Sequence, residues 1–394
     1  MQSSTNATFQ GIVRPDGRVA TRNYIGIFVV GNCGATTARR IAAAFTEARL
    51  AEWPGVDGVV AFTHEIGCGM EMTGEPMDLL RRTIAGTIRN PNIGGALVIA
   101  LGCERNNIDG FLEQEKLTVG PRLKRLVMQE LGGTQNTIDA GIAAVREMLP
   151  LVADVRRETV SARHLVVGLQ TDASDDKAAA VAPALGAAVD LLVREGGTAI
   201  LSGTAGLAPV ADNLKVRAAT PEVRTQFEQR VQWWKQYSEG RDIRMRRQSD
   251  AAQADNAARR AGTTPMTAVY EYARPVTSNG LVFMDAPNYE AVSATGQIAS
   301  GATLICVVTG TGSGFGALPA PTLKVAAISD LYRAMEDDLD IDAGPVADGT
   351  VKAEQMGADI FARLLRHASG EKTRAEELGL GENEFVPWPI GVLA

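Results

Sequence analysis

Three cysteines recur at an equal spacing of 35 residues in the first third of the chain, at Cys33, Cys68 and Cys103. Each follows an apolar run and has small or polar neighbours. A period of this length accommodates one strand, one helix and their turns, so the thiols are expected at the ends of consecutive parallel strands. Open α/β sheets build their sites at such ends. The spacing indicates a thiol-containing pocket or a soft metal site, and the alternative is three small residues buried in tight turns.

An imidazole and a carboxylate accompany these thiols. His64 follows an expected strand and precedes Cys68 by four positions, and Glu104 directly follows Cys103. A histidine at a strand end can bind a metal or transfer a proton near neutral pH. We therefore predict that His64 and Glu104 are catalytic. The predicted metal ligands are His64, Cys33, Cys68 and Cys103.

A glycine-rich segment, Gly310–Gly316, follows a second apolar run. Glycines let the backbone approach an anion closely, and the hydroxyls of Thr311 and Ser313 add hydrogen-bond donors, so both residues are predicted to bind substrate. The segment lacks the Gly-Lys-Ser/Thr of a Walker loop. The first apolar run also lacks the glycine spacing of a dinucleotide fingerprint, which disfavours a nucleotide-dependent oxidoreductase.

The elements that must position these residues alternate regularly along the 394-residue chain. Continuous apolar runs separated by helical patterns predict parallel sheets covered on both faces. The charged stretch Val152–Ala162 has no clear period, and the alternation restarts after it. We predict an α/β fold with two doubly wound, mainly parallel domains, residues 1–152 and 153–394, and a site in the cleft between them. The expected strands of the two domains are Tyr24–Val30, Val56–Phe62 and Ala96–Leu101, then His164–Leu169, Ala199–Ser202, Leu281–Asp285 and Leu304–Thr309.

Composition excludes several classes of protein. The net charge is −7 and the pI is near 5.3, without a long basic block, so neither nucleic acid nor a membrane surface is an expected partner. The N-terminus lacks a leader pattern and no apolar run is long enough to span a membrane. Four dispersed cysteines favour reduced thiols. A cytoplasmic location is expected.

Four peripheral segments carry weaker expectations. Gly11–Thr21 predicts a polar arm or a hairpin, and the aromatic, proline-rich tail Asn383–Pro389 is expected to dock on the body. Ser238–Arg260 is polar and predicts a surface excursion. The five acids of Glu336–Asp342 fit no calcium-loop spacing, so a solvated acidic turn is expected rather than a cation site.

The order of these motifs resembles the catalytic region of the altronate/galactarate dehydratase family over nearly the whole chain. The matching segments are Arg14–Val19 with Arg22–Tyr24, Asn32-Cys33, His64 with Gly67–Gly69, Gly102–Glu104, Gly132–Thr134, Gly168–Gln170, Gly196–Ser202, Ser293–Gln297, Met335–Asp338 and Asn383–Trp388.

The resemblance implies a lyase that eliminates water from a sugar acid and gives a 2-keto-3-deoxy acid. It implies a divalent metal, and iron suits mixed thiolate and imidazole ligation better than magnesium does, with manganese as an alternative. A three-cysteine iron–sulfur cluster is a less favoured variant. Asn32 and Gln170 lie in matching motifs and are predicted to bind substrate. The large subunit of sulfolactate sulfo-lyase shares the same body, so the leaving group stays open.

Departures from the family pattern motivate a second hypothesis. A small N-terminal substrate-binding domain of the family is not seen ahead of this region, so a separate small subunit is a candidate partner, and a homo-oligomer is expected. Three thiols, a carboxylate and an amine of the pattern are replaced in the second half. The replaced segments are Thr171–Asp176, Ser202–Thr204, Ala317–Pro319 and Asp342–Gly344.

These losses favour, as the alternative, a catalytically silent paralogue that binds a sugar acid or scaffolds a partner. The two hypotheses differ in what the new acids do. Convergence of Asp172, Asp175 or Asp342 on His64 and Cys68 indicates a retuned metal site, whereas acids directed to solvent indicate the silent paralogue.

Overall fold

The structure is a computed structural model that describes residues 6–171, 176–239, 255 and 258–390. Its strands form three sheets, two of them entirely parallel. The smaller parallel sheet contains, in spatial order, β4 (Gly58–Phe62), β3 (Tyr24–Val29), β5 (Ile93–Ala100) and β6 (Leu123–Val127). The larger one contains β10 (Met266–Tyr270), β11 (Gly280–Met284), β9 (Thr198–Ser202), β8 (Val166–Thr171), β12 (Leu304–Thr309), β13 (Thr322–Ala326) and β14 (Ile341–Asp342). The predicted α/β class is confirmed.

Helices cover both faces of each parallel sheet. In the smaller sheet, one face packs on α3 (Glu75–Ile88) and α4 (Ile108–Gln114), and the other on α1 (Ala35–Ala43) and α5 (Thr134–Ala153). The strands are therefore buried on both sides, which explains their continuous apolar runs. The shorter helices of the chain are α2 (Glu47–Leu50), α7 (Thr204–Leu207), α8 (Ala211–Lys215), α12 (Ser329–Ala334), α13 (Gly344–Ala347) and α15 (Arg374–Glu377).

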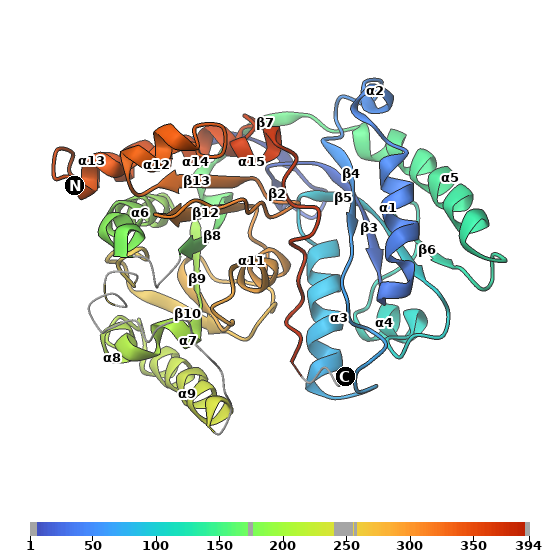
Figure 1. The fold of residues 1–394 in the computed structure, drawn as a ribbon, viewed down its shortest axis with the longest axis horizontal. Coiled ribbons are helices and arrows are strands. Elements are labelled where there is room, and N and C mark those ends of the chain that lie inside the picture. Colours follow the sequence, from blue (N-terminus) through green and yellow to red (C-terminus); the bar gives the residue numbers. More distant parts are fainter. Residues whose placement is uncertain (1–5, 172–175, 240–254, 256–257, 391–394) are drawn as a thin grey trace.

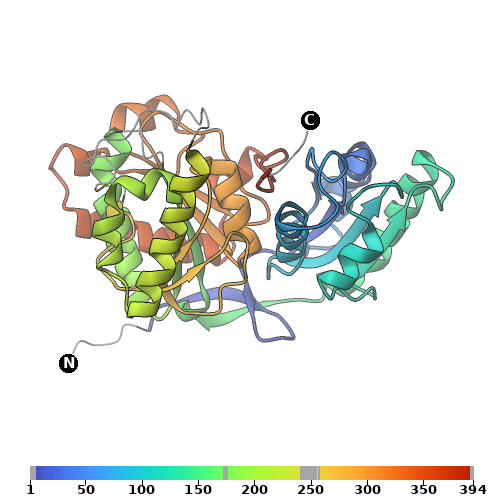
Figure 2. The ribbon, with the colours of Figure 1, turned by 90° about the horizontal axis from the view of Figure 1, so that it is seen from below.

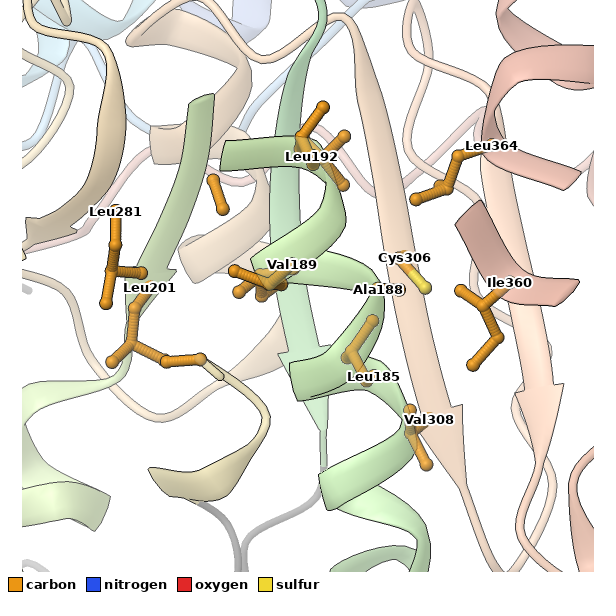
Figure 3. Close-up of a cluster of buried hydrophobic side chains, with 14 of the residues drawn as sticks. Leu185, Ala188, Val189, Leu192, Leu201, Leu281, Cys306, Val308, Ile360 and Leu364 are labelled. Carbon is orange, nitrogen blue, oxygen red and sulfur yellow. The ribbon is translucent and has the colours of Figure 1, made fainter. Parts of the chain in front are cut away.

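The larger sheet has its main core between α6 (Asp176–Arg194), α14 (Ala353–Ala368) and the strands. Figure 3 shows Leu185 and Leu192 of α6 directed at Cys306 of β12 and at Leu364 of α14. The opposite face packs on α11 (Glu290–Ala299), and α9 (Pro221–Ser238) lies along the β10 edge. Cys306 is wholly buried here and belongs to the core.

A third, antiparallel sheet joins the two halves. β1 (Thr8–Val13) pairs with β2 (Val19–Ala20) and with β7 (Arg157–Ser161), so the expected hairpin forms and the chain returns to it between the parallel sheets. Figure 2 shows this ribbon crossing from one half to the other. The predicted boundary at residues 152–153 falls at the end of α5, just before β7.

Buried polar side chains cross between the two halves. Arg22 donates to both carboxylate oxygens of Glu376 at 2.6 and 2.8 Å, and to the carbonyls of His367 and Glu371. Asn90 donates to the carbonyls at both ends of the 298–302 turn after α11. A fully buried charge pair holds only when its geometry satisfies both partners, so these contacts fix how the halves meet.

The acidic run 336–342 differs from its expectation. Asp340 is buried and accepts hydrogen bonds from the backbone N–H groups of Lys324 and Arg374, and Asp342 accepts from Ser329 and Gly344. These two acids therefore anchor backbone rather than face solvent. The expectation of a wholly solvated turn was wrong because sequence spacing does not show which carboxylates meet free N–H groups.

Replacing Arg22 with methionine is expected to lower the free energy of unfolding by roughly 3–5 kcal/mol, because the Glu376 carboxylate stays buried without its cation. Urea unfolding of purified protein measures the loss. The matched control is Arg374→Met on the neighbouring exposed pair with Glu377, which is expected to cost far less because solvent screens that pair. Equal losses in the two variants would contradict a role for burial.

Candidate functional site

The predicted chemical residues lie at a topological switch point of the smaller sheet. β3 is flanked by β4 on one side and by β5 on the other. The connection from β3 to β4 and the connection from β5 to β6 therefore run in opposite directions across the sheet. Cys33 follows β3, His64 and Cys68 follow β4, and Cys103 follows β5. Such crevices are where open α/β sheets hold ligands. The spacing of 35 residues therefore does bring the loops to one edge of one sheet.

Close backbone contacts hold these three loops together. Gly67 has φ +110° and lies so near the Val30 carbonyl that a Cβ would sit 2.4 Å from that oxygen. Asn106 donates to the Val30 carbonyl, accepts from Arg81 of α3, and takes the Gly67 carbonyl with its backbone N–H. Only glycine fits at position 67, because both the conformation and the space exclude a side chain.

The three thiols gather around the loop after β3. Cys33 and Cys103 are exposed and Cys68 is partly buried. Burial raises the pKa of the Cys68 thiol, and Cys33, followed by Glu104 and Cys103, raises it further. A Cβ at Gly31 would lie 2.7 Å from Glu104 Cγ and 3.5 Å from Cys68 Sγ, so this glycine makes room for both side chains. Its surroundings therefore favour the neutral thiol at Cys68.

Glu104 holds its own loop. Its two carboxylate oxygens accept the backbone N–H groups of Leu101 and of Gly102, the latter at 2.8 Å, and the side chain is buried. Charge-assisted bonds of this kind order a loop efficiently. Glu104 is thus placed beside the thiols, with both oxygens already engaged by backbone donors.

His64 is buried, and its Nε2 lies 2.9 Å from the Val29 carbonyl. Burial lowers its pKa to about 4, so the ring is neutral at pH 7. Because Val29 offers only an acceptor, Nε2 must carry the proton and Nδ1 the lone pair. Within the described part of the chain, Nδ1 is itself buried and meets no partner in hydrogen-bond geometry, although the Ile66 backbone acts to raise the pKa of the ring. The ring therefore has one nitrogen fixed to the backbone and one basic nitrogen left over.

The predicted metal ligands do not form a complete ligand set by themselves. Among the described residues, no group of three or more His, Cys, Asp or Glu side chains is arranged to hold a metal ion. His64 is tied to Val29 and Glu104 to its own backbone, which leaves the thiols as the flexible donors. Metal dependence, including the iron–sulfur variant, stays a prediction.

Residues predicted to bind substrate are divided between the two sheets. Asn32 is exposed beside Cys33 on the smaller sheet, with its Oδ1 3.8 Å from that thiol. Gln170 lies one residue before the end of β8 in the larger sheet and is buried, where it donates to Ser293 and Gln297 of α11 at 2.9 and 2.8 Å. Its amide donors are thus engaged in a packed network.

The glycine-rich loop follows β12, as predicted. Its Thr309 hydroxyl accepts from the N–H groups of Thr311 and Gly312, and Ser313 accepts from Phe315 while its carbonyl receives Lys324 Nζ at 3.0 Å. Burial lowers the pKa of Lys324. Its hydrogen bond to the Ser313 carbonyl stabilises the loop. Sequence reasoning missed this lysine, although it is the single charge in the apolar strand 322–326.

A second missed residue is Asp285, which directly follows β11. It is buried and accepts hydrogen bonds from Thr204 and from the indole of Trp234 at 2.5 and 2.6 Å. Burial raises the pKa of its carboxyl group. The sequence does contain a signal for this residue, because a carboxylate at the end of a parallel strand is a candidate site residue. Asp285 was predicted from the sequence only as the last residue of an expected strand.

Of the three acids proposed as replacement metal ligands, the structure describes only Asp342. Asp342 bonds to Ser329 and to the Gly344 backbone, so its Oδ1 is engaged within the β14–α13 turn. It does not join His64 and Cys68. Asp172 and Asp175 lie outside the described residues, as does most of the polar stretch 238–260.

The docked tail contributes to the same region. Phe385 packs edge-on against Phe62 and lies with its ring centroid 6.2 Å from that of His64, and Val386 is held by Thr295 of α11. Figure 1 shows this segment descending between α11 and α3. The tail thus covers His64 from the side of the larger sheet, which confirms that it docks on the body.

Two family models together match almost the whole chain. Residues 11–153 match the family model described as "D-galactarate dehydratase/Altronate hydrolase, second domain", and residues 162–393 match "D-galactarate/Altronate dehydratase, C-terminal". The chain is 30% identical to "Galactarate dehydratase (L-threo-forming)" of Escherichia coli over 97% of its length and 77% of the relative. It is 26% identical to "Altronate dehydratase" of Bacillus subtilis over 95% of its own length and 76% of the relative.

A third relative has a different name. The chain is 27% identical to "(2R)-sulfolactate sulfo-lyase subunit beta" of Chromohalobacter salexigens over 96% of each chain. Two parallel α/β sheets with a switch-point site, and relatives named as dehydratases, define an enzyme of the lyase class. The chain belongs to the D-galactarate/altronate dehydratase family. Its described helices include none that is long and apolar enough to cross a membrane.

Thiol reactivity should follow the exposure of the four cysteines. Cys33 and Cys103 are expected to react rapidly with a disulfide reagent such as DTNB, and Cys68 more slowly, because burial and its neighbours raise its pKa. Cys306 should react only in denaturant, because burial strongly raises its pKa. Timed labelling with peptide mass spectrometry gives the order, and rapid labelling of Cys306 in the native protein would contradict this core.

The buried ring of His64 predicts a pH-dependent stability. Its pKa rises from about 4 in the folded chain to the ordinary 6.5 on unfolding, so the unfolded chain binds more protons between these values. Stability is thus lost as the pH falls from 6.5 towards 4, and this histidine contributes up to roughly 3 kcal/mol of the loss.

The variant His64→Gln keeps an N–H donor for the Val29 carbonyl and removes the titration. Urea unfolding at pH 7 and pH 4.5 is expected to show a smaller pH-dependent loss in this variant than in the wild type. His164→Gln, at a partly exposed histidine, is the control and should leave the wild-type pH dependence nearly unchanged. An identical pH dependence in wild type and His64→Gln would show that the ring is not buried neutral.

Proposed function

We propose that this chain is a hydro-lyase that removes water from a sugar acid of the galactarate or altronate type. The observation that supports it most is that the loops carrying His64 and the three thiols follow neighbouring strands at one switch point, in a chain matched along almost its whole length by dehydratases. The reaction breaks a C–H bond next to the carboxylate and the C–O bond at the adjacent carbon. It yields water and an enol, which becomes the 2-keto-3-deoxy acid.

In this proposal His64 accepts the proton. An elimination needs a base that is unprotonated at the working pH, and the pKa of His64, lowered by burial to about 4, meets that condition. Its Nε2 bond to Val29 orients the ring and leaves Nδ1 as the base. Glu104 has both oxygens on its own backbone and acts as the residue that positions the Cys103 loop.

The anionic end of the substrate has two sources of donors. Asn32 stands exposed beside Cys33, and Thr311 is exposed on the glycine-rich loop, whose Ser313 carbonyl accepts a hydrogen bond from the Lys324 ammonium. Gln170 and Ser313 act through the packing of those loops. A divalent metal, iron or manganese, remains the expected cofactor. A separate small subunit remains an expected partner. The name "subunit beta" of the sulfo-lyase relative supports this expectation, because it indicates that the relative works with another subunit.

The test is product formation by anaerobically purified protein with and without added Fe²⁺ or Mn²⁺. Galactarate, altronate and (2R)-sulfolactate are supplied separately, and 2-keto acid and sulfite are measured by mass spectrometry. Keto-acid release without sulfite from a sugar acid is expected. Sulfite release from sulfolactate instead would assign the sulfo-lyase reaction.

The variant His64→Gln is expected to lose about 10²-fold or more of kcat, the usual contribution of a general base. Arg333→Gln, at an exposed pair on α12, is the matched control and should keep full activity. A wild-type protein that binds these acids but releases no product under any metal condition, even with a small subunit, would replace the lyase by the silent paralogue.

A further inference from the structure

A cavity separate from the thiol cluster lies where α3 of the smaller sheet faces the larger sheet. It has a volume of about 230 Å³, and none of its lining residues belongs to the thiol cluster. Arg82 enters from α3, Arg230 from α9, and Glu271 and Arg274 from the turn after β10. The volume suits a small molecule and is below the usual range for nucleotide-sized ligands.

Three guanidinium groups in this cavity share one carboxylate. Glu271 lies 3.3 Å from Arg274, 3.7 Å from Arg230 and 3.8 Å from Arg82, and about half of its side chain is exposed. These separations are longer than those of well-formed charge-assisted hydrogen bonds. The carboxylate is therefore held loosely, and each arginine keeps donors that a closer anion could take.

The arginines also repel one another. Burial lowers the pKa of Arg82, and the charge of Arg274 is the next largest cause. Arg82 spends its Nε on the Tyr272 carbonyl at 2.8 Å, which directs the rest of its guanidinium to the cavity. A bound carboxylate closer to the three guanidinium groups than Glu271 would offset this repulsion more fully, because attraction between charges grows as their separation falls.

The other walls suit hydroxyl groups and carbon-bound hydrogens. Asp285 forms part of the lining, and Glu75 and Asp78 of α3 add two more carboxylates. Carboxylates accept hydrogen bonds from hydroxyls. The indole of Trp388, stacked on Trp234, gives a flat apolar surface. Arginines at one side and acceptors at the other together match a molecule that carries a carboxylate and hydroxyl groups.

We propose that this cavity binds a small hydroxylated carboxylic acid, whose carboxylate displaces Glu271 from between Arg82, Arg230 and Arg274. The choice of a hydroxylated acid is in keeping with the proposed function, but binding here requires no turnover. Because Arg82 belongs to one half of the molecule and the other two arginines to the other half, the bound acid links both. Substrate and a regulatory acid share this chemistry.

The experiment is isothermal titration calorimetry of the full chain with 2-hydroxyglutarate, a hydroxy acid with no hydroxyl at the position from which water would leave. Xylitol, a polyol without charge, is the control ligand. Arg230→Gln and Arg274→Gln are each expected to weaken binding of 2-hydroxyglutarate roughly tenfold or more, the usual effect of losing a charged hydrogen bond. Arg333→Gln, the exposed control, should bind like the wild type.

Glu271→Gln provides the opposite test, since removing the internal competitor should tighten binding of 2-hydroxyglutarate. A gain of affinity cannot come from misfolding. Unchanged affinity in both arginine variants, or no binding to either the wild type or Glu271→Gln, would overturn the proposal. Binding of xylitol as tight as that of the acid would also overturn it.

Kinetics with whichever acid is turned over then distinguishes the two sources of ligand. A raised KM in Arg230→Gln assigns the cavity to the substrate. An unchanged KM, with loss of any effect of 2-hydroxyglutarate on the rate, assigns it to a regulatory acid. Absence of turnover with binding intact would refute the proposed lyase function and leave this site standing.

Discussion

The arrangement of the molecule depends on a buried polar junction between its two parallel sheets. Arg22 follows the N-terminal hairpin and forms an ion pair with Glu376, more than 350 positions later in the chain. It also donates hydrogen bonds to two backbone carbonyls. Such a pair is stabilising only when every donor and acceptor is satisfied, so it tolerates few alternative placements of the halves. The cavity around Glu271 also has walls from both halves, since Arg82 comes from α3 and Arg230 from α9.

Close backbone approach plays the corresponding part inside the smaller sheet. Gly31 and Gly67 allow three loops to lie against one another, and Asn106 ties all three with its backbone and side chain. The thiols are therefore held on a rigid base while two of them remain exposed. A site that must present reactive groups gains from such support, because the supporting contacts, rather than the groups themselves, absorb the strain.

Polar side chains of the second half are engaged in structural contacts. Asp342 binds the neighbouring turn, and Gln170 belongs to a packed network with α11. Lys324 and Asp285 remain as buried charges at the ends or within the strands of the larger sheet. The first half therefore carries the proton chemistry in our proposal, and the second half contributes anion recognition through its loops and its arginines.

Sequence alone determined the class of the fold and the edge at which the thiols gather, because continuous apolar strands and a 35-residue period have few geometric solutions. It also placed the tail on the body. It could not show that Asp340 caps backbone, that Glu104 spends its oxygens on its own loop, or that Lys324 reaches Ser313. The convergence of Arg82, Arg230 and Arg274 was equally invisible, since they lie far apart in the chain. Hydrogen-bond partners and shared cavities are decided by how separate elements pack, and that is a property of the tertiary structure only.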